Sequence, residues 1–158
     1  MLQSRGNKEI SLGKKRVIMP VYIGLMLLVY LGYILLDNSR LKQSEQWINA
    51  NNLTQRNIQS IEQLGFWASI LEVAFLGLLV LATFLLFQYR KNGKILVHFI
   101  TLHLCLFTAV FLIGYISSFF LIAPLGNLTQ PLILSTFLLM LIVIYTVFVL
   151  MKEQLSKR

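Results

Sequence analysis

The hydrophobic pattern divides the chain into four long apolar runs that are separated by shorter polar segments. The runs cover residues 17–36, 65–89, 95–122 and 131–151. Each reaches or approaches the roughly 20 residues that a helix needs to cross a bilayer at 1.5 Å rise per residue. Helices that are apolar on every face are typical of membrane spans rather than of the surface of a soluble domain. We therefore predict an all-α membrane protein with four transmembrane helices.

The polar segment between the first two runs, residues 37–64, predicts a short helical hairpin outside the membrane. A first helix is expected to begin at Arg40 after a cap at Asn38 or Ser39, and residues 49–52 are expected to break it. Thr54 is placed to cap a second helix that continues into the next span. Apolar side chains along this segment either pack on the protein's own spans or form a docking surface. They are Leu41, Trp47, Ile48, Ile58 and Ile61.

The other polar segments are short, and none is long enough for a soluble domain. We expect a flexible basic tail before the first span, a basic turn, a loop and a second basic tail. In chain order these are residues 1–16, 90–94, 123–130 and 152–158. A basic stretch before the first run resembles the start of a signal peptide. The run is too long and no small-residue cleavage site follows it, so a retained span is the better interpretation.

Composition supports the membrane interpretation. Of the 158 residues, 57% are hydrophobic and 13% are charged, whereas about 25% are charged in a typical soluble domain. The mean hydropathy is +0.74. The expected surroundings are therefore the lipid bilayer. The net charge of +8 would suit nucleic acid, but the basic residues stand at the ends of the apolar runs. That placement indicates membrane orientation, and we expect no nucleic-acid partner.

The distribution of Lys and Arg predicts the orientation. Eleven of these residues fall in the two tails and the basic turn, three fall in residues 37–64, and none falls in residues 123–130. Basic residues accumulate in cytoplasmic loops. Four spans with both termini in the cytoplasm satisfy this bias. The hairpin then faces the outside, and a bacterial inner, or cytoplasmic, membrane is the expected location.

Glu72 interrupts the second apolar run and is the main candidate for a functional residue. At helical spacing it shares a face with Gly65, Ala68 and Ser69, small residues that let a neighbouring helix approach closely. A carboxylate at this depth is costly against lipid and usually faces the bundle interior or a wet cavity. Glu72 is therefore either a structural or assembly contact, or a proton or cation site. Its expected neighbours at similar depth are Tyr30, Tyr33 and Tyr115.

A second pattern runs along the third span, where polar side chains recur every three or four residues. This face is either a seam between helices or a hydrophilic path that leads from the cytoplasmic side towards Glu72. The seam is favoured because threonine hydroxyls can bond to their own helix backbone. The stripe consists of His98, Thr101, Cys105 and Thr108.

The sequence contains no pattern that identifies a metal, a cofactor or a catalytic centre. His98 and His103 are five residues apart, which is poor helical spacing for shared ligation, and an interfacial position would be ordinary for both. The single cysteine, Cys105, excludes an internal disulfide and a thiolate metal site. A lipid-modifying enzyme that uses one of the histidines is a minor hypothesis.

These patterns favour a non-enzymatic membrane component that works through helix–helix contacts. It would be an accessory subunit, sensor, regulator or immunity-type protein, with a membrane-protein partner or as a homo-oligomer. The alternative is a homo-oligomeric channel or small transporter in which Glu72 binds a proton or cation. Four spans alone rarely enclose a permeation path, so this alternative requires several copies.

Overall fold

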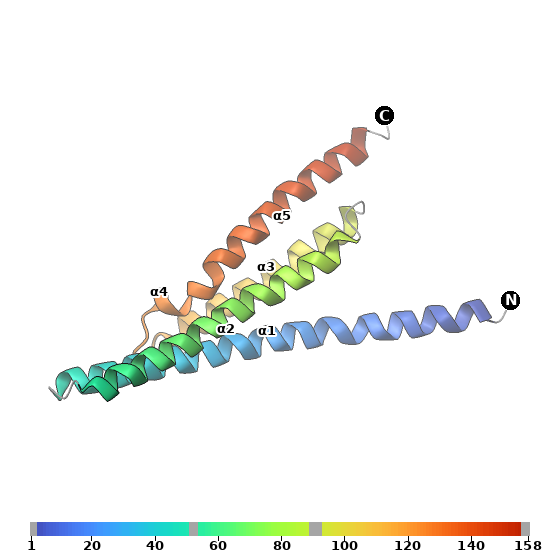
Figure 1. Ribbon diagram of the computed structural model, residues 1–158. Helices are drawn as coiled ribbons and strands as arrows, with labels where there is room; N and C mark the ends of the chain where they lie inside the picture. The colour runs from blue at the N-terminus through green and yellow to red at the C-terminus, as the bar shows by residue number, and fades with distance from the viewer. Residues whose placement is uncertain (1–2, 51–53, 89–92, 156–158) are drawn as a thin grey trace.

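The computed structural model describes residues 3–50, 54–88 and 93–155, and every regular element in these ranges is a helix. Part of the break predicted at residues 49–52, most of the turn at 90–94 and the last three residues of the C-terminal tail lie outside the described ranges. The helices are α1 (Gln3–Asn49), α2 (Gln55–Phe87), α3 (Gly93–Ser117), α4 (Leu125–Leu128) and α5 (Gln130–Leu155) (Figure 1).

Four of these helices are long and apolar enough to cross a membrane. The candidate spans are Met19–Asn49, Gln55–Leu86, Gly93–Ser117 and Gln130–Lys152. In each of them, the most apolar stretch is largely exposed on the outside of the bundle, as expected for side chains that face lipid. The all-α class and the number of apolar helices agree with the prediction, and they indicate a polytopic membrane protein.

Helix α1 differs from the prediction at both ends, because it is one unbroken helix of 47 residues. The tail expected to be flexible is helical from Gln3 onward, and no new helix starts at Arg40. Neither expected cap residue acts as a cap. The Ser39 hydroxyl donates to the Leu35 carbonyl in the preceding turn at 2.7 Å, and Asn38 Oδ1 accepts the Ile122 amide at 3.0 Å. Residues 37–49 are therefore a continuation of α1.

Helix α2 begins and continues as predicted. Thr54 is its N-cap, and the Asn57 amide donates to the Thr54 hydroxyl oxygen at 3.4 Å. The helix then runs without a break through residues 55–64 into the apolar span. A hydroxyl at this position satisfies one of the amides that a helix start leaves unpaired.

The segment between the third and fourth spans is more structured than expected. Helix α3 ends at Ser117, five residues before the predicted limit of 122, and turns follow. The predicted loop at 123–130 contains the four-residue helix α4. The Thr129 hydroxyl donates to the Leu125 carbonyl at 3.0 Å and closes this helix. Helix α5 starts at the next residue.

Helices α1 and α2 pack against each other as antiparallel neighbours. Two contacts fix their register. A Cβ atom built on Gly65 would lie 3.5 Å from Arg40 Cδ, and the rings of Tyr30 and Phe75 have centroids 6.3 Å apart. Ten residues along α1 therefore correspond to ten residues in the opposite direction along α2.

The core lies where all four long helices converge near α4. Helix α5 packs on α2 and α3, and its C-terminal half diverges from them (Figure 1). The side chains that fill the core come from every helix. They include Met26, Tyr30, Tyr33, Ala68, Phe75, Leu79, Leu106, Val110, Leu128, Leu132 and Leu139.

Candidate functional site

Polar side chains gather at the end of the bundle that holds α4. We call this group the α4-end cluster, and it consists of Tyr33, Asp37, Arg40, Glu72 and Asn127. Three of its members stand at spacings of four and three on α1, so they share one helix face. The antiparallel register brings α2 alongside, and α4 supplies the last member.

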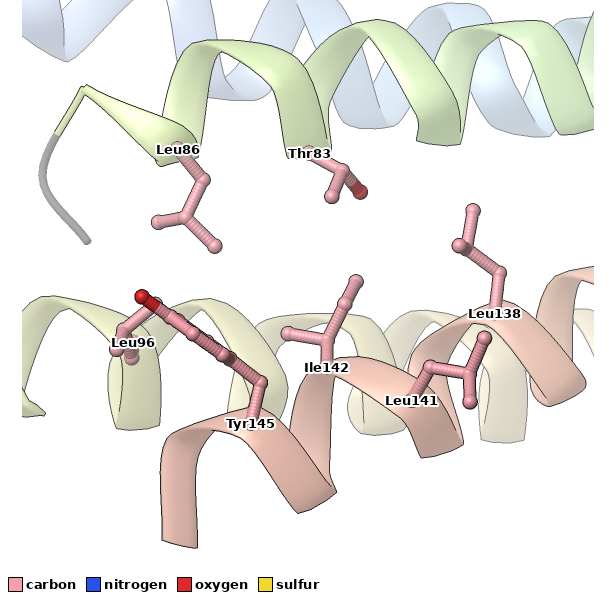
Figure 2. A pocket seen from close by; sticks show the side chains of 7 residues that line it. All are labelled: Thr83, Leu86, Leu96, Leu138, Leu141, Ile142 and Tyr145. Atoms are coloured by element: carbon pink, nitrogen blue, oxygen red, sulfur yellow. The ribbon is translucent and has the colours of Figure 1, made fainter. Parts of the chain in front are cut away.

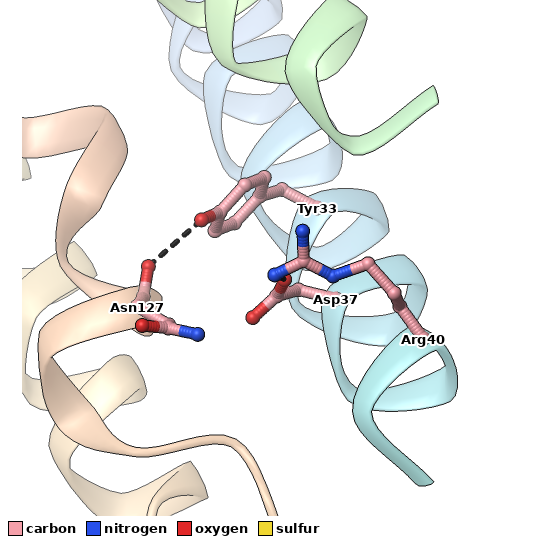
Figure 3. Close-up of polar contacts among 4 residues, drawn as sticks. All are labelled: Tyr33, Asp37, Arg40 and Asn127. Atoms are coloured by element: carbon pink, nitrogen blue, oxygen red, sulfur yellow. Dashed lines mark hydrogen bonds and ion pairs between the residues drawn. The ribbon is translucent and has the colours of Figure 1, made fainter. Parts of the chain in front are cut away.

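An ion pair links two members of the cluster. Arg40 Nη2 lies 2.6 Å from Asp37 Oδ1, one helical turn away (Figure 3). Asp37 is only 2% exposed, and its other oxygen, Oδ2, is buried with no hydrogen-bond partner in the described part of the chain. The stem of Arg40 passes over Gly65 of α2. A Cβ atom at position 65 would make ordinary van der Waals contact with this stem, 3.5 Å from Cδ, so Arg40 packs directly on α2 at Gly65.

Two buried tyrosines of α1 hold the segment around α4. The Tyr33 hydroxyl donates to the Asn127 carbonyl at 2.8 Å, and the Tyr30 hydroxyl donates to the Leu128 carbonyl at 3.0 Å. Both side chains lie in the core. To reach Leu128, the Tyr30 hydroxyl passes directly over Gly114 of α3, where a Cβ atom would collide with it. The tyrosines predicted near Glu72 thus connect α1 to the segment between α3 and α5.

Glu72 is the member of the cluster that α2 supplies, and it is half-buried. The α1–α2 register places it level with Tyr33. Its carboxylate makes no hydrogen bond or ion pair with any residue that the structure describes. Of the small residues on its predicted face, Ala68 is buried in the core, whereas Ser69 is exposed. Glu72 therefore stands at the border between the core and the outer surface.

Tyr115 does not join the other predicted neighbours of Glu72. It is 46% exposed, and its ring packs edge-on against Phe119 with centroids 5.0 Å apart. The three predicted neighbours are thus divided, because Tyr30 and Tyr33 are buried whereas Tyr115 faces outward.

The polar stripe of α3 lies on the outside of the bundle. His98, Thr101, Cys105 and Thr108 are all exposed. The two threonine hydroxyls donate to carbonyls of their own helix, Thr101 to Val97 at 3.0 Å and Thr108 to Leu104 at 2.8 Å. Within a single chain the stripe is therefore neither an internal seam nor an internal path.

His103, which the sequence suggested to be interfacial, is instead fully buried. Its Nδ1 lies 2.8 Å from the Phe99 carbonyl, and its Nε2 lies 2.8 Å from the Tyr22 hydroxyl. Since a carbonyl only accepts, Nδ1 carries the proton, and neutral Nε2 accepts from Tyr22. The spacing of His103, Phe107, Val110 and Gly114 along α3 is the signal that would have placed this histidine on the buried face.

The predicted docking residues at the α1–α2 end divide in the same way. Leu41 packs against the core of the protein, and Trp47 and Ile61 are half-buried. Ile48 and Ile58 are exposed, at 55% and 46%. Leu41 therefore packs on the protein itself, whereas the docking surface at Ile48 and Ile58 stays a prediction.

Among the described residues, three cavities between helices are each lined mainly by apolar side chains. One of about 190 Å³ lies where α5 diverges, and side chains of α2, α3 and α5 face one another around it (Figure 2). A second of about 570 Å³ lies between α3 and α5, and a third of about 290 Å³ contains Tyr22 and His103. None of the three includes Glu72. The described residues also contain no group of three acidic, histidine or cysteine side chains suited to a metal.

No protein-family model, curated protein or solved structure matches this chain.

Proposed function

We propose that this chain is a non-enzymatic, polytopic membrane protein that acts through helix–helix contacts with a membrane partner. The role would be that of an accessory subunit, sensor, regulator or immunity-type component. The observation that carries the proposal is Glu72, a half-buried acid within a candidate span whose carboxylate has no hydrogen bond or ion pair in the described part of the chain.

A polar group at this depth is stabilised when another helix supplies a hydrogen bond or a charge. The neighbouring exposed hydroxyl of Ser69 gives such a helix a second polar contact. The outward polar stripe on α3 supports the same role, because His98 and Cys105 there also face away from the core. Helix contact explains both features without a catalytic centre.

Photocrosslinking in the membrane tests this proposal. A photoreactive amino acid replaces Ser69 beside Glu72, and a matched variant carries it at Leu81, which is 63% exposed elsewhere on α2. We expect a discrete crosslinked product from position 69 that is absent from position 81. The product should disappear when Glu72→Leu is added. A chain that remains an uncrosslinked monomer from both positions would count against the proposal.

The alternative function is a homo-oligomeric channel or small transporter with Glu72 as its proton or cation site. The same unpaired carboxylate favours it, together with the second acid, Asp37, in the α4-end cluster. The three described cavities do not reach Glu72, so a path would have to form between copies. Flux of protons, common cations or small solutes into proteoliposomes tests this function. If the wild-type protein shows no flux, this function is rejected. If flux persists in Glu72→Gln, Glu72 is not the ion site.

A further inference from the structure

The buried carboxylate of Asp37 is only half satisfied. Oδ1 pairs with Arg40, whereas Oδ2 is buried and has no partner in the described ranges. A buried polar atom without a partner costs free energy, and the cost is larger for a charged group. A bound group that supplies positive charge or a hydrogen-bond donor would therefore stabilise this oxygen.

The balance of charge around Tyr33 favours a positive charge. Asp37 and Arg40 lie on the same face of α1 as Tyr33, one and two turns away, and the α1–α2 register places Glu72 level with Tyr33. With all three ionised, the group carries one uncompensated negative charge. One additional positive charge would neutralise it, whereas a divalent ion would leave an excess beside the guanidinium.

The atoms of the cluster that are free to coordinate a cation are oxygens. Besides Asp37 Oδ2 they are the Glu72 carboxylate and the Asn127 carbonyl, which accepts the Tyr33 hydroxyl and has a second lone pair. Figure 3 shows the Asp37 carboxylate and Asn127 on facing sides of the cluster. Oxygen donors select hard cations. We propose that Asp37 Oδ2 is the principal ligand of a monovalent hard cation of the sodium class, and that Glu72 completes the charge balance.

This inference rests on the alternative function, for which it names the ion and adds Asp37 to the site. Binding is measured on the purified chain, without a partner and without flux. If the protein binds the cation but shows no flux, the proposed site is retained and the channel function is rejected. A protein that does not bind sodium would leave the helix-contact proposal unaffected.

Thermal unfolding of the purified protein in mild detergent tests the site. Sodium chloride replaces choline chloride at constant ionic strength and pH 7.5. A ligand that binds only the folded state raises the unfolding temperature, by about 3–5 °C at roughly ten times the dissociation constant. We expect a saturable rise of this size with sodium. No rise, or an equal rise in choline, would overturn the proposal.

Two variants and a control connect the effect to the cluster. Asp37→Asn combined with Arg40→Gln removes both charges of the ion pair, so no buried charge is left unpaired, and it should abolish the sodium response. Glu72→Gln should raise the sodium concentration needed for half the effect. Glu45→Gln, at an exposed acid farther along α1, should leave the response unchanged. A sodium response that persists in the double variant overturns the proposal. The proposal is also overturned if a lower pH without sodium raises the unfolding temperature equally, because the bound cation would then be a proton.

Discussion

Among the described glycines, Gly114 leaves the least space for a side chain, because it lies against Tyr30. The Tyr30 hydroxyl occupies the space where a Cβ of residue 114 would stand, and it donates to the Leu128 carbonyl. Gly114→Ala should therefore displace a fully buried ring and weaken this hydrogen bond. We expect a loss of about 1–3 kcal/mol, typical of overpacking in a filled core, measured as a lower unfolding temperature in detergent.

The opposite result is expected where a helical glycine has space. Gly77→Ala in α2 meets no atom within 4 Å and should be neutral or stabilising, because alanine favours the helix by up to about 1 kcal/mol.

In a Tyr30→Phe background the colliding hydroxyl is absent, so Gly114→Ala should cost less there than in the wild type. Equal costs in both backgrounds would show that the hydroxyl is not the obstacle.

The buried pair of His103 and Tyr22 gives a second prediction at this scale. Tyr22→Phe removes the donor to Nε2 and leaves a buried acceptor unpaired, which should cost about 1–3 kcal/mol. Adding His103→Leu removes that acceptor, so the double variant should be more stable than the sum of the two single losses predicts. Unfolding temperatures of the two single variants and the double variant provide the comparison. Additive losses would contradict a direct hydrogen bond between the two side chains.

At the scale of single elements, one hydroxyl contributes to the start of α2. The Asn57 amide donates to the Thr54 hydroxyl at 3.4 Å and to the Thr54 carbonyl at 3.0 Å. Thr54→Ala removes the hydroxyl acceptor only and should weaken the first turn by about 0.5–1 kcal/mol. Amide hydrogen exchange over residues 55–60 should become a few times faster, while exchange in the apolar part of α2 stays the same. Thr101→Ala, whose hydroxyl bonds within its own exposed helix face, is the matched control. Unchanged exchange at residues 55–60 would contradict the cap.

The elements differ in how well the sequence alone predicts them. The apolar runs locate α2, α3 and α5 well, because length and hydropathy decide whether a segment crosses a membrane. The continuity of α1 was missed, since Asn38 and Ser39 are typical caps and only the structure shows Asn38 engaged by Ile122. A local cap signal is reliable only where the side chain has no tertiary partner.

The candidate site was predictable to a similar degree. Glu72 stands out in any apolar run, and Tyr30 and Tyr33 were expected near its depth. The role of Asp37 was not visible, because an acid at the end of a span is ordinary until its burial is known. Burial of Asp37 and His103 depends on how α1 packs against α3 and α4, which the spacing along one helix does not specify.

For the whole molecule, the length of α1 sets how far the protein extends from the bilayer. Its 47 residues span about 70 Å at 1.5 Å per residue, against a hydrocarbon core of about 30 Å. Much of α1 must therefore lie in water. Exposed charged side chains beyond the α4-end cluster, such as Lys42, Glu45 and Glu62, suit the continuations of α1 and α2 to that position.

The basic residues predict the orientation of this extended end. Three Lys or Arg residues stand in residues 37–64, against eleven in the tails and the basic turn, and basic segments are retained in the cytoplasm. In a Cys105→Ser background, Ala50→Cys should react with a membrane-impermeant maleimide in intact bacterial cells. Gln154→Cys should react only after the membrane is permeabilised, which also controls for the reactivity of the thiol. Labelling of Gln154→Cys but not Ala50→Cys in intact cells would invert the topology, and with it the side from which a cation or a partner reaches the α4-end cluster.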